Sequence, residues 1–229
     1  MRQNMPGLFI TFEGGEGSGK TTQLKALLTH LRSTGREAIE TRDPGGTPIG
    51  KQIRALLLDR DNIRMAPAAE LLLYEASRAQ LVHEIVRPAL QAGRIVLCDR
   101  FADSTVAYQG YGRGLDLELI ARLNALATDG LRPDLTFLLD LDPAVGLLRA
   151  IRRLADPQER YDRIEGEVLA FHQRVRTGYR SIAAAEPERV IVLDASDGMS
   201  EIEGHIRRRV TEVFRASLGA AGSGTPASR

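Results

Sequence analysis

Short apolar runs alternate with longer amphipathic stretches along most of the chain. The runs with the length and composition of buried strands lie at residues 8–13, 37–42, 94–99, 135–141 and 190–194. The stretches between them have helical periodicity and predict helices at about 19–33, 48–58, 67–92, 116–128, 143–153, 166–185 and 199–217. Alternating strands and helices are typical of a parallel sheet covered on both faces. The pattern therefore predicts an α/β fold of three layers, with a five-stranded parallel sheet flanked by helices.

The domain organisation is simple. The chain has 229 residues, a length that favours one domain with a substantial core. We find neither an internal repeat nor a linker within residues 1–218, which we interpret as a single domain. Residues 219–229 are small and polar, so no burial offsets the entropy of ordering them. We expect this segment to be a flexible tail.

The charge balance restricts the possible partners. The 31 Lys and Arg residues against 30 Asp and Glu leave a formal charge of +1, which provides no overall field for a nucleic acid or an anionic membrane. Charges interrupt every apolar run before it reaches the ~20 residues that cross a bilayer. The single cysteine, Cys98, excludes an internal disulfide, and the N-terminus lacks a secretory pattern. We expect a cytoplasmic protein that binds neither nucleic acid nor membrane.

The strongest motif lies between the first predicted strand and the first predicted helix. It fits G-x-x-x-x-G-K-[ST] and consists of Gly14, Gly15, Glu16, Gly17, Ser18, Gly19, Lys20 and Thr21. Glycines allow backbone N–H groups to surround a phosphate at a helix N-terminus, Lys20 can reach the β- and γ-phosphates, and Thr21 can hold Mg²⁺. The segment predicts a nucleoside-triphosphate site of the P-loop NTPase fold.

A phosphate loop identifies the ligand class without the reaction, because kinases, GTPases and transport ATPases all use one. The sequence contains neither the Asn-Lys-x-Asp run of GTPases nor the Leu-Ser-Gly-Gly-Gln signature of transporters. The other motifs must therefore distinguish the remaining classes.

The third predicted strand ends in Cys98 and Asp99, and Arg100 follows it. Ligands of open α/β sheets bind beyond the carboxyl ends of the strands, so Asp99 can orient Mg²⁺ and Arg100 can bind an acceptor phosphate. The alternative is a surface ion pair. We interpret Cys98 as a buried apolar thiol, since its strand position shows no activating base.

The second predicted strand leads into Asp43, Pro44, two glycines and Thr47. These residues reach the same edge of the sheet and favour a tight loop that faces a ligand. An equally good interpretation is a strand-to-helix turn in which Thr47 caps the helix.

Two further segments could bind a nucleotide base. Tyr74 and Arg78 are four residues apart in a predicted helix, so an aromatic ring and a fork of donors share one face. A core aromatic beside a cation that reaches solvent would have the same spacing. The segment after Arg100 supplies hydroxyls and an amide that can fix a base edge and a sugar, although its glycine-rich part could be an ordinary loop: Ser104, Thr105, Tyr108 and Gln109.

An arginine-rich segment follows the fourth predicted strand. It contains Arg149, Arg152, Arg153, Arg160 and Arg163, with Pro157 between them. A mobile arginine that closes over a transferring phosphoryl group can accelerate the reaction by ~10³–10⁵. We predict a mobile lid at about 149–166; the alternative is a solvated helix end followed by an exposed loop.

With these motifs in order, the chain resembles the bacterial thymidylate kinases, a family of nucleoside-monophosphate kinases, from Leu8 to about Phe214. The matching segments are the phosphate loop, 42–47 (RDPGGT), 99–101 (DRF), 103–110 (DSTVAYQG), 132–135 (RPDL) and 162–165 (DRIE). The resemblance implies transfer of the γ-phosphoryl of ATP to dTMP with Mg²⁺, giving dTDP. It also implies a homodimer formed near residues 67–92.

The resemblance assigns roles to the candidate residues. The phosphate loop, with Lys20 and Thr21, would bind the donor, and Asp99 would support the metal. Arg100 would bind the acceptor phosphate, and Asp43 would lie near the sugar and the metal. Thymine would stack on Tyr74, where phenylalanine is common, and Arg78 would contact its O4. The acceptor pocket would be completed by Ser104, Thr105, Tyr108 and Gln109, with Tyr108 crowding the 2′ position.

The family supplies its catalytic arginine from the phosphate loop or from the lid. Here the loop position is Glu16, which cannot stabilise phosphoryl charge, so the lid must provide the cation. We choose Arg153, ahead of Arg152 and Arg149, and Arg149 could instead lie against adenine. A kinase for another acceptor, such as a deoxynucleoside, and a P-loop ATPase switch that acts on a protein partner remain as alternatives.

Overall fold

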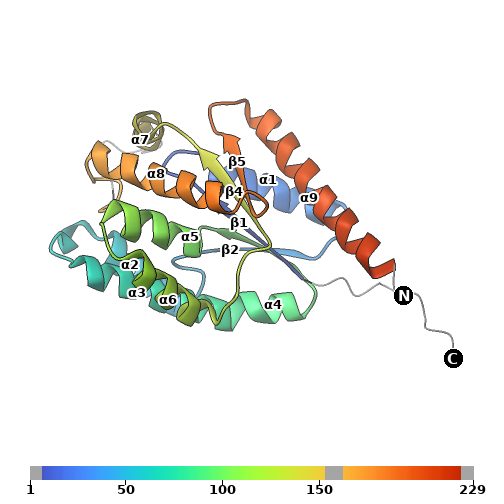
Figure 1. The fold of residues 1–229 in the computed structure, drawn as a ribbon, viewed down its shortest axis with the longest axis horizontal. Coiled ribbons are helices and arrows are strands. Elements are labelled where there is room, and N and C mark those ends of the chain that lie inside the picture. The colour runs from blue at the N-terminus through green and yellow to red at the C-terminus, as the bar shows by residue number, and fades with distance from the viewer. Residues whose placement is uncertain (1–6, 153–161, 223–229) are drawn as a thin grey trace.

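The computed structural model describes residues 7–152 and 162–222. These residues form a five-stranded parallel sheet of order β2-β3-β1-β4-β5 (Figure 1). The strands are β1 (Leu8–Glu13), β2 (Ala38–Arg42), β3 (Ile95–Asp99), β4 (Leu135–Asp140) and β5 (Val190–Asp194). Each lies within one residue of its predicted bounds. Because β1 pairs with both β3 and β4, the strand that leads into the phosphate loop is central.

Helices cover both faces of the sheet, which confirms the three-layer prediction (Figure 1). On one face, α1 and α9 pack over a core that includes Ile10, Phe12 and Phe137. The opposite face is covered mainly by α3, α4, α8 and the helical segment after β3. The helices are α1 (Lys20–Ser33), α2 (Pro48–Leu58), α3 (Pro67–Leu81), α4 (Arg87–Gln91), α5 (Ala102–Thr105), α6 (Leu117–Thr128), α7 (Pro143–Arg152), α8 (Leu169–Ala185) and α9 (Met199–Gly222), with a 3₁₀ turn η1 (Arg60–Asn62).

The helical prediction needs corrections. The helix expected at 67–92 is α3 and α4 joined by a π-helical turn, η2 (Val82–Val86), next to Pro88, which has no N–H to donate. No helix was predicted in the segment after β3, and its glycine-rich part could have been an ordinary loop. The segment is helical, with α5 continuing into a second π-helical turn, η3 (Val106–Gly112). Helix α9 runs to Gly222, so it includes the start of the segment expected as a tail, and residues 223–229 lie outside the described residues.

The central strand is fully buried along its length, including its last residue, Glu13. Cys98 on β3 is also fully buried, and burial raises the pKa of its thiol well above the usual value. The interpretation of Cys98 as an apolar core residue is therefore confirmed.

Helix α7 packs so closely against the phosphate loop that only glycine fits at the two points of contact. A Cβ added at Gly146 would lie 2.3 Å from the carbonyl oxygen of Glu16, and one at Gly17 would lie 2.2 Å from the carbonyl oxygen of Gly146. Both contacts are with backbone atoms, which cannot rotate away. Gly17 also has a φ of 64°, in the left-handed region that glycine tolerates. The two glycines therefore fix the arginine-bearing helix against the loop.

Gly146→Ala should lower the free energy of unfolding by roughly 1–3 kcal/mol, because the added methyl group must push α7 away from the loop. Gly204→Ala is the matched control, since this other helical glycine has only an ordinary contact, 3.7 Å from Arg208. It should raise the free energy of unfolding by roughly 0.4–1 kcal/mol by restricting the unfolded chain. Urea denaturation measures the free energy of unfolding of both variants. A change in the same direction in both would contradict the close packing of α7 against the loop.

Candidate active site

The carboxyl ends of β1, β2 and β3 meet at one edge of the sheet, where two pockets open side by side. The first surrounds the phosphate loop and the start of α1. The second extends from this loop between α2, α3, α5 and η3. The pockets share a wall of charged side chains, Glu16, Asp43, Arg54, Arg100 and Asp162. The first is lined by Gly17, Ser18, Gly19, Lys20, Thr21 and Asp99, and the second by Tyr74, Arg78, Ser104, Thr105, Tyr108 and Gln109.

The phosphate loop has the conformation that its glycines predict. Gly14, Gly17 and Gly19 have φ values of 136°, 64° and 91°, which are costly for other residues. Nζ of Lys20 donates hydrogen bonds to the carbonyl oxygens of Gly14, at 3.1 Å, and Gly15, at 2.7 Å. Burial, followed by the charge of Arg100, lowers the pKa of Lys20 to about 8. An anion bound in the loop would favour the charged form of this lysine.

Thr21 and Asp99 come together, as the sequence predicts. Oγ1 of Thr21 donates a hydrogen bond to Oδ2 of Asp99 at 2.7 Å, and both side chains line the first pocket. A hydroxyl and a carboxylate are hard oxygen donors of the kind that Mg²⁺ accepts beside phosphate oxygens. This pair fits a magnesium ion at the mouth of the phosphate loop.

Arg100 is held between the two pockets by several contacts. Its Nη2 lies 2.7 Å from Oε1 of Glu16, and its Nη1 donates to the carbonyl oxygen of Gly14 at 3.0 Å. The hydroxyl of Tyr108 donates to the same oxygen of Glu16 at 2.9 Å. Although burial acts in the opposite direction, the charges of Arg100 and Lys20 lower the pKa of Glu16 to about 2. The alternative of a surface ion pair between Asp99 and Arg100 is therefore wrong, because each pairs with a residue of the phosphate loop or α1.

A buried acid beneath Arg100 was missed by the sequence analysis. Glu13 accepts hydrogen bonds from the backbone N–H of Phe101 at 2.7 Å, the hydroxyl of Ser104 at 2.6 Å and that of Tyr179 at 2.8 Å. Both hydroxyls also contact Nη1 of Arg100. Burial, and then the charge of Asp103, raises the pKa of Glu13 to about 7. The signal was present in the sequence, since a charged residue ends an otherwise apolar strand.

Asp43 and Arg78 form a fully buried ion pair. Nε of Arg78 lies 2.7 Å from Oδ2 of Asp43, and the arginine side chain is only 1% exposed. Arg78 is thus not a cation that reaches solvent, and this alternative is wrong. Thr47 does cap α2, because its Oγ1 accepts a hydrogen bond from the N–H of Gly50 at 2.9 Å. The interpretation of Thr47 as a helix cap is therefore confirmed. The capped turn also presents Asp43 to both pockets, and its contact with a ligand stays a prediction.

The second pocket also contains polar groups that could meet a base. Oγ1 of Thr105 is buried and has no hydrogen-bond partner among the described residues. Gln109 is 1% exposed, and its Nε2 donates to Oε1 of Glu70 at 2.8 Å. Tyr74 is partly buried, and burial raises the pKa of its hydroxyl, which stays neutral. The π-helical turn η3 places Tyr108 and Gln109 in the pocket, and such turns are frequent at functional sites.

Arg54 and Asp162 are wall residues that the sequence analysis did not assign. Nη1 of Arg54 donates to the carbonyl oxygen of Pro44 at 3.2 Å, which brings its guanidinium between the pockets. Oδ1 of Asp162 accepts the N–H groups of Ile164 and Glu165. A lone arginine on an amphipathic helix gives no local signal of function.

The arginines in the described part of the arginine-rich segment have different environments. Nη1 of Arg149 donates to the carbonyl oxygen of Ala195 at 3.0 Å, and Arg152 is exposed. Arg163 does not line the first pocket, because it pairs with Glu70 at 2.6 Å. Arg153 and Arg160 lie outside the described residues, so the choice of Arg153 stays a prediction.

Comparisons with known proteins agree on one family. The family model "Thymidylate kinase" matches residues 12–206. The chain is 57% identical over 205 residues to the thymidylate kinase of Geotalea uraniireducens, covering 89% of this chain and 96% of that protein. It is 54% identical over 206 residues to the thymidylate kinase of Deinococcus radiodurans, covering 90% and 97%.

A crystal structure of thymidylate kinase from Ehrlichia chaffeensis superposes with a TM-score of 0.72 at 35% identity, covering 90% of this chain and 99% of that one. Among the described residues, we find no helix long and apolar enough to cross a membrane. The motif order, the paired pockets and these matches lead to one conclusion: the chain belongs to the thymidylate kinase family.

Proposed function

We propose that this chain transfers the γ-phosphoryl group of ATP to dTMP, with Mg²⁺, and so produces dTDP for the synthesis of dTTP in the cytoplasm. One observation carries the proposal most directly: the phosphate-loop pocket shares a wall that contains Arg100 and Arg54 with a second pocket, which is lined by an aromatic ring and polar side chains. A reaction between two phosphorylated nucleotides needs this arrangement. A switch that responds to a protein partner has no use for the second pocket.

The donor would occupy the phosphate loop. Backbone N–H groups at the start of α1 and the Lys20 ammonium compensate the charge of the β- and γ-phosphates. Thr21 and Asp99 would hold Mg²⁺ there, and the ion would neutralise charge that develops on the phosphoryl oxygens.

The acceptor phosphate would lie against Arg100 and Arg54. Both guanidinium groups line both pockets, so they can orient an acceptor oxygen toward the donor. This oxygen is already ionised at neutral pH, so the reaction needs neither a covalent protein nucleophile nor a strong general base. Tyr108 and Asp43 would border the sugar, where the Tyr108 ring favours deoxyribose.

The base would lie on Tyr74, between Arg78 and Gln109. A guanidinium has five N–H groups. Arg78 donates to Asp43, Glu75, Asn124 and the carbonyl oxygen of Phe101, which leaves one Nη2 hydrogen without a partner among the described residues. This hydrogen can reach a carbonyl oxygen of the base, which supports the assignment to thymine O4.

An acceptor panel tests the proposed function. ADP release should depend on added dTMP and should be far slower with deoxynucleosides or without an acceptor, because these lack a phosphate for Arg100. A coupled assay with dTMP, dUMP, dCMP and thymidine measures this. ATP hydrolysis stimulated only by a protein or a nucleic acid would contradict the proposal and support a switch.

We retain Arg153 as the catalytic arginine of the lid. Glu16 is committed to Arg100 and Tyr108, so the phosphate loop itself brings an anion rather than a cation to the reaction. Arg153→Ala should therefore lower kcat by at least roughly 100-fold with little change in stability, as expected for the loss of an arginine finger. Arg152→Ala is the matched control, because this neighbour is exposed at the end of α7 and should retain near-normal kcat. Near-normal turnover of the Arg153 variant would move the role to another residue.

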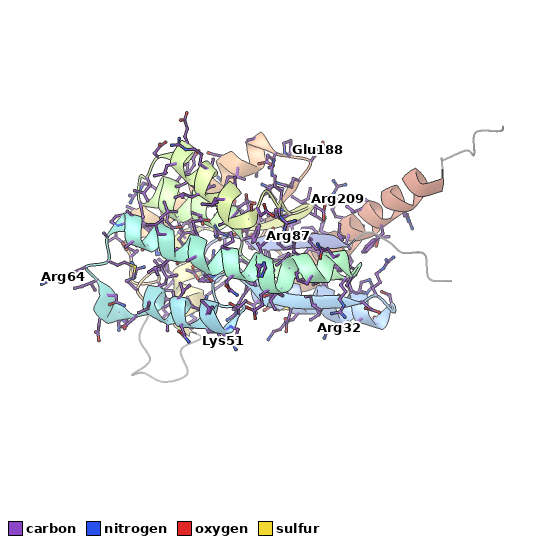
Figure 2. All side chains as sticks on the ribbon, turned by 90° about the horizontal axis from the view of Figure 1, so that it is seen from below. Arg32, Lys51, Arg64, Arg87, Glu188 and Arg209 are labelled. Atoms are coloured by element: carbon purple, nitrogen blue, oxygen red, sulfur yellow. The ribbon has the colours of Figure 1, made fainter. Side chains whose placement is uncertain are left out.

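We also propose a homodimer formed through α2, α3 and α6, which lie side by side (Figure 2). Their outer faces expose Leu56, Leu72 and Leu126 at 51%, 55% and 78%, and α3 adds exposed alanines that permit close helix packing. Charged Arg64 and Lys51 lie toward the margins of this view. A second copy of the same face would cover these leucines.

Leu72→Asp should shift the protein toward a monomer, because two carboxylates would be buried in the interface. Val192→Asp is the control, since this residue is 49% exposed but lies on β5, away from the three helices. Sedimentation velocity measures the oligomeric state of both variants. A monomeric unmodified protein would exclude the dimer.

A further inference from the structure

Glu70 occupies a buried junction behind the second pocket. It lies in the first turn of α3 and is 1% exposed. Its Oε1 accepts hydrogen bonds from Nε2 of Gln109, at 2.8 Å, and Nε of Arg113, at 3.1 Å. Its Oε2 accepts from Nη2 of Arg113, at 3.1 Å, and lies 2.6 Å from Nη1 of Arg163. Every group that faces this carboxylate in these contacts is an N–H donor.

The charge of Glu70 determines which end of the Gln109 amide faces it. Burial alone would raise its pKa, but hydrogen bonds from Arg113 and Gln109 and the arginine charges lower it, so the group stays ionised. An ionised carboxylate can only accept hydrogen bonds. The amide of Gln109 must therefore turn Nε2 toward Glu70, which leaves Oε1 as the polar atom that it offers to the second pocket.

The resulting pattern matches one kind of pyrimidine. Arg78 offers an N–H donor and Gln109 offers an oxygen acceptor in the same pocket. Thymine and uracil present a carbonyl acceptor at C4 next to an N–H donor at N3, which complements this pair. Cytosine presents an amino donor at C4 next to an acceptor at N3. Its amino group would face the N–H donor of Arg78, and its N3 would face the oxygen of Gln109.

We propose that Glu70 is a positioning residue that fixes the hydrogen-bond polarity of Gln109 and thereby selects pyrimidines that carry N3–H. The inference rests on the proposed function, because it takes dTMP as the acceptor and the second pocket as its site. Glu70 acts through Gln109 without touching the substrate.

Glu70→Gln should reverse this polarity. The new amide has one oxygen and one NH₂ group. The oxygen is favoured at the Oε2 position, where the charged groups of Arg113 and Arg163 both donate, over the Oε1 position, where one of the two donors is the neutral amide of Gln109, which can turn over. The NH₂ group would then face Gln109, which could bond to it only by turning its own oxygen away from the pocket. The substrate would meet the NH₂ group of Gln109, which repels N3–H.

The test compares dTMP with 5-methyl-dCMP, which differs from it only at the N3 and C4 groups. In Glu70→Gln, kcat/KM for dTMP should fall by roughly 10–100-fold, the range expected when one buried hydrogen bond is lost. The loss should appear in KM with little change in kcat, because the base lies away from the reacting phosphates. The ratio of kcat/KM for dTMP over 5-methyl-dCMP should fall by at least about 10-fold. An unchanged ratio in a folded variant would overturn the role of Glu70.

Glu167→Gln is the matched control. Glu167 pairs with Nη1 of Arg113, so the variant removes a carboxylate charge from the same cluster without contacting Gln109. If the cluster had only a structural role, the ratio of kcat/KM for dTMP over 5-methyl-dCMP would change by the same factor in both variants. We expect the substrate ratio of Glu167→Gln to stay within about twofold of the unmodified enzyme, as for a site that makes no contact with the base. A ratio that falls equally in both variants would also overturn the proposal.

A second measurement needs no variant and decides the question if Glu70→Gln fails to fold. The unmodified enzyme is titrated calorimetrically with dTMP and with 3-methylthymidine monophosphate, which has N–CH₃ in place of N3–H and keeps both carbonyl groups. The analogue should bind roughly 10-fold more weakly, because Oε1 of Gln109 loses its donor. Equal or tighter binding would overturn the proposal. If the unmodified enzyme transfers no phosphoryl group to dTMP, the proposed function fails instead.

Discussion

The ion pair between Arg100 and Glu16 joins the two halves of the site. Glu16 belongs to the phosphate loop, whereas Arg100 directly follows β3 and has a left-handed conformation, with a φ of 69°. Such a conformation is costly for a residue other than glycine and persists only where its surroundings enforce it. Here the guanidinium of Arg100 is held by hydrogen bonds to Glu16, to the carbonyl oxygen of Gly14 and to the hydroxyls of Ser104 and Tyr179. Both pockets therefore depend on the position of one side chain.

The site concentrates charge in a protein whose formal net charge is only +1. Buried charges are costly unless they are paired, and here Arg78 pairs with Asp43 and Arg100 with Glu16. The pairs hold their guanidinium groups in place before any nucleotide binds, so little reorganisation is needed when phosphates arrive. Preorganised positive charge fits a phosphoryl transfer that relies on positioning and charge compensation.

The sequence predicts the fold and the phosphate loop well, because both follow from local patterns. Hydrophobic periodicity locates the strands, and the glycine spacing with Lys20 identifies the loop. Glu13 and Arg54 were missed because their importance arises only when distant segments meet. The helical conformation at 102–112 was missed because its glycines and hydroxyls favour a loop locally, while packing against α8 stabilises the π-helical turn. The same limit applies to Glu70, whose partners lie on two other segments: Gln109 and Arg113 at η3, and Arg163 before α8.

We expect two nucleotides to bind with their phosphates facing each other across the wall formed by Arg100 and Glu16. A crystal structure with dTMP and a non-hydrolysable ATP analogue tests it most directly. We predict the triphosphate in the glycine loop, the dTMP phosphate on Arg100, and thymine between Tyr74 and Arg78. A thymidine nucleotide bound elsewhere, or with its phosphate turned away from the triphosphate, would contradict it.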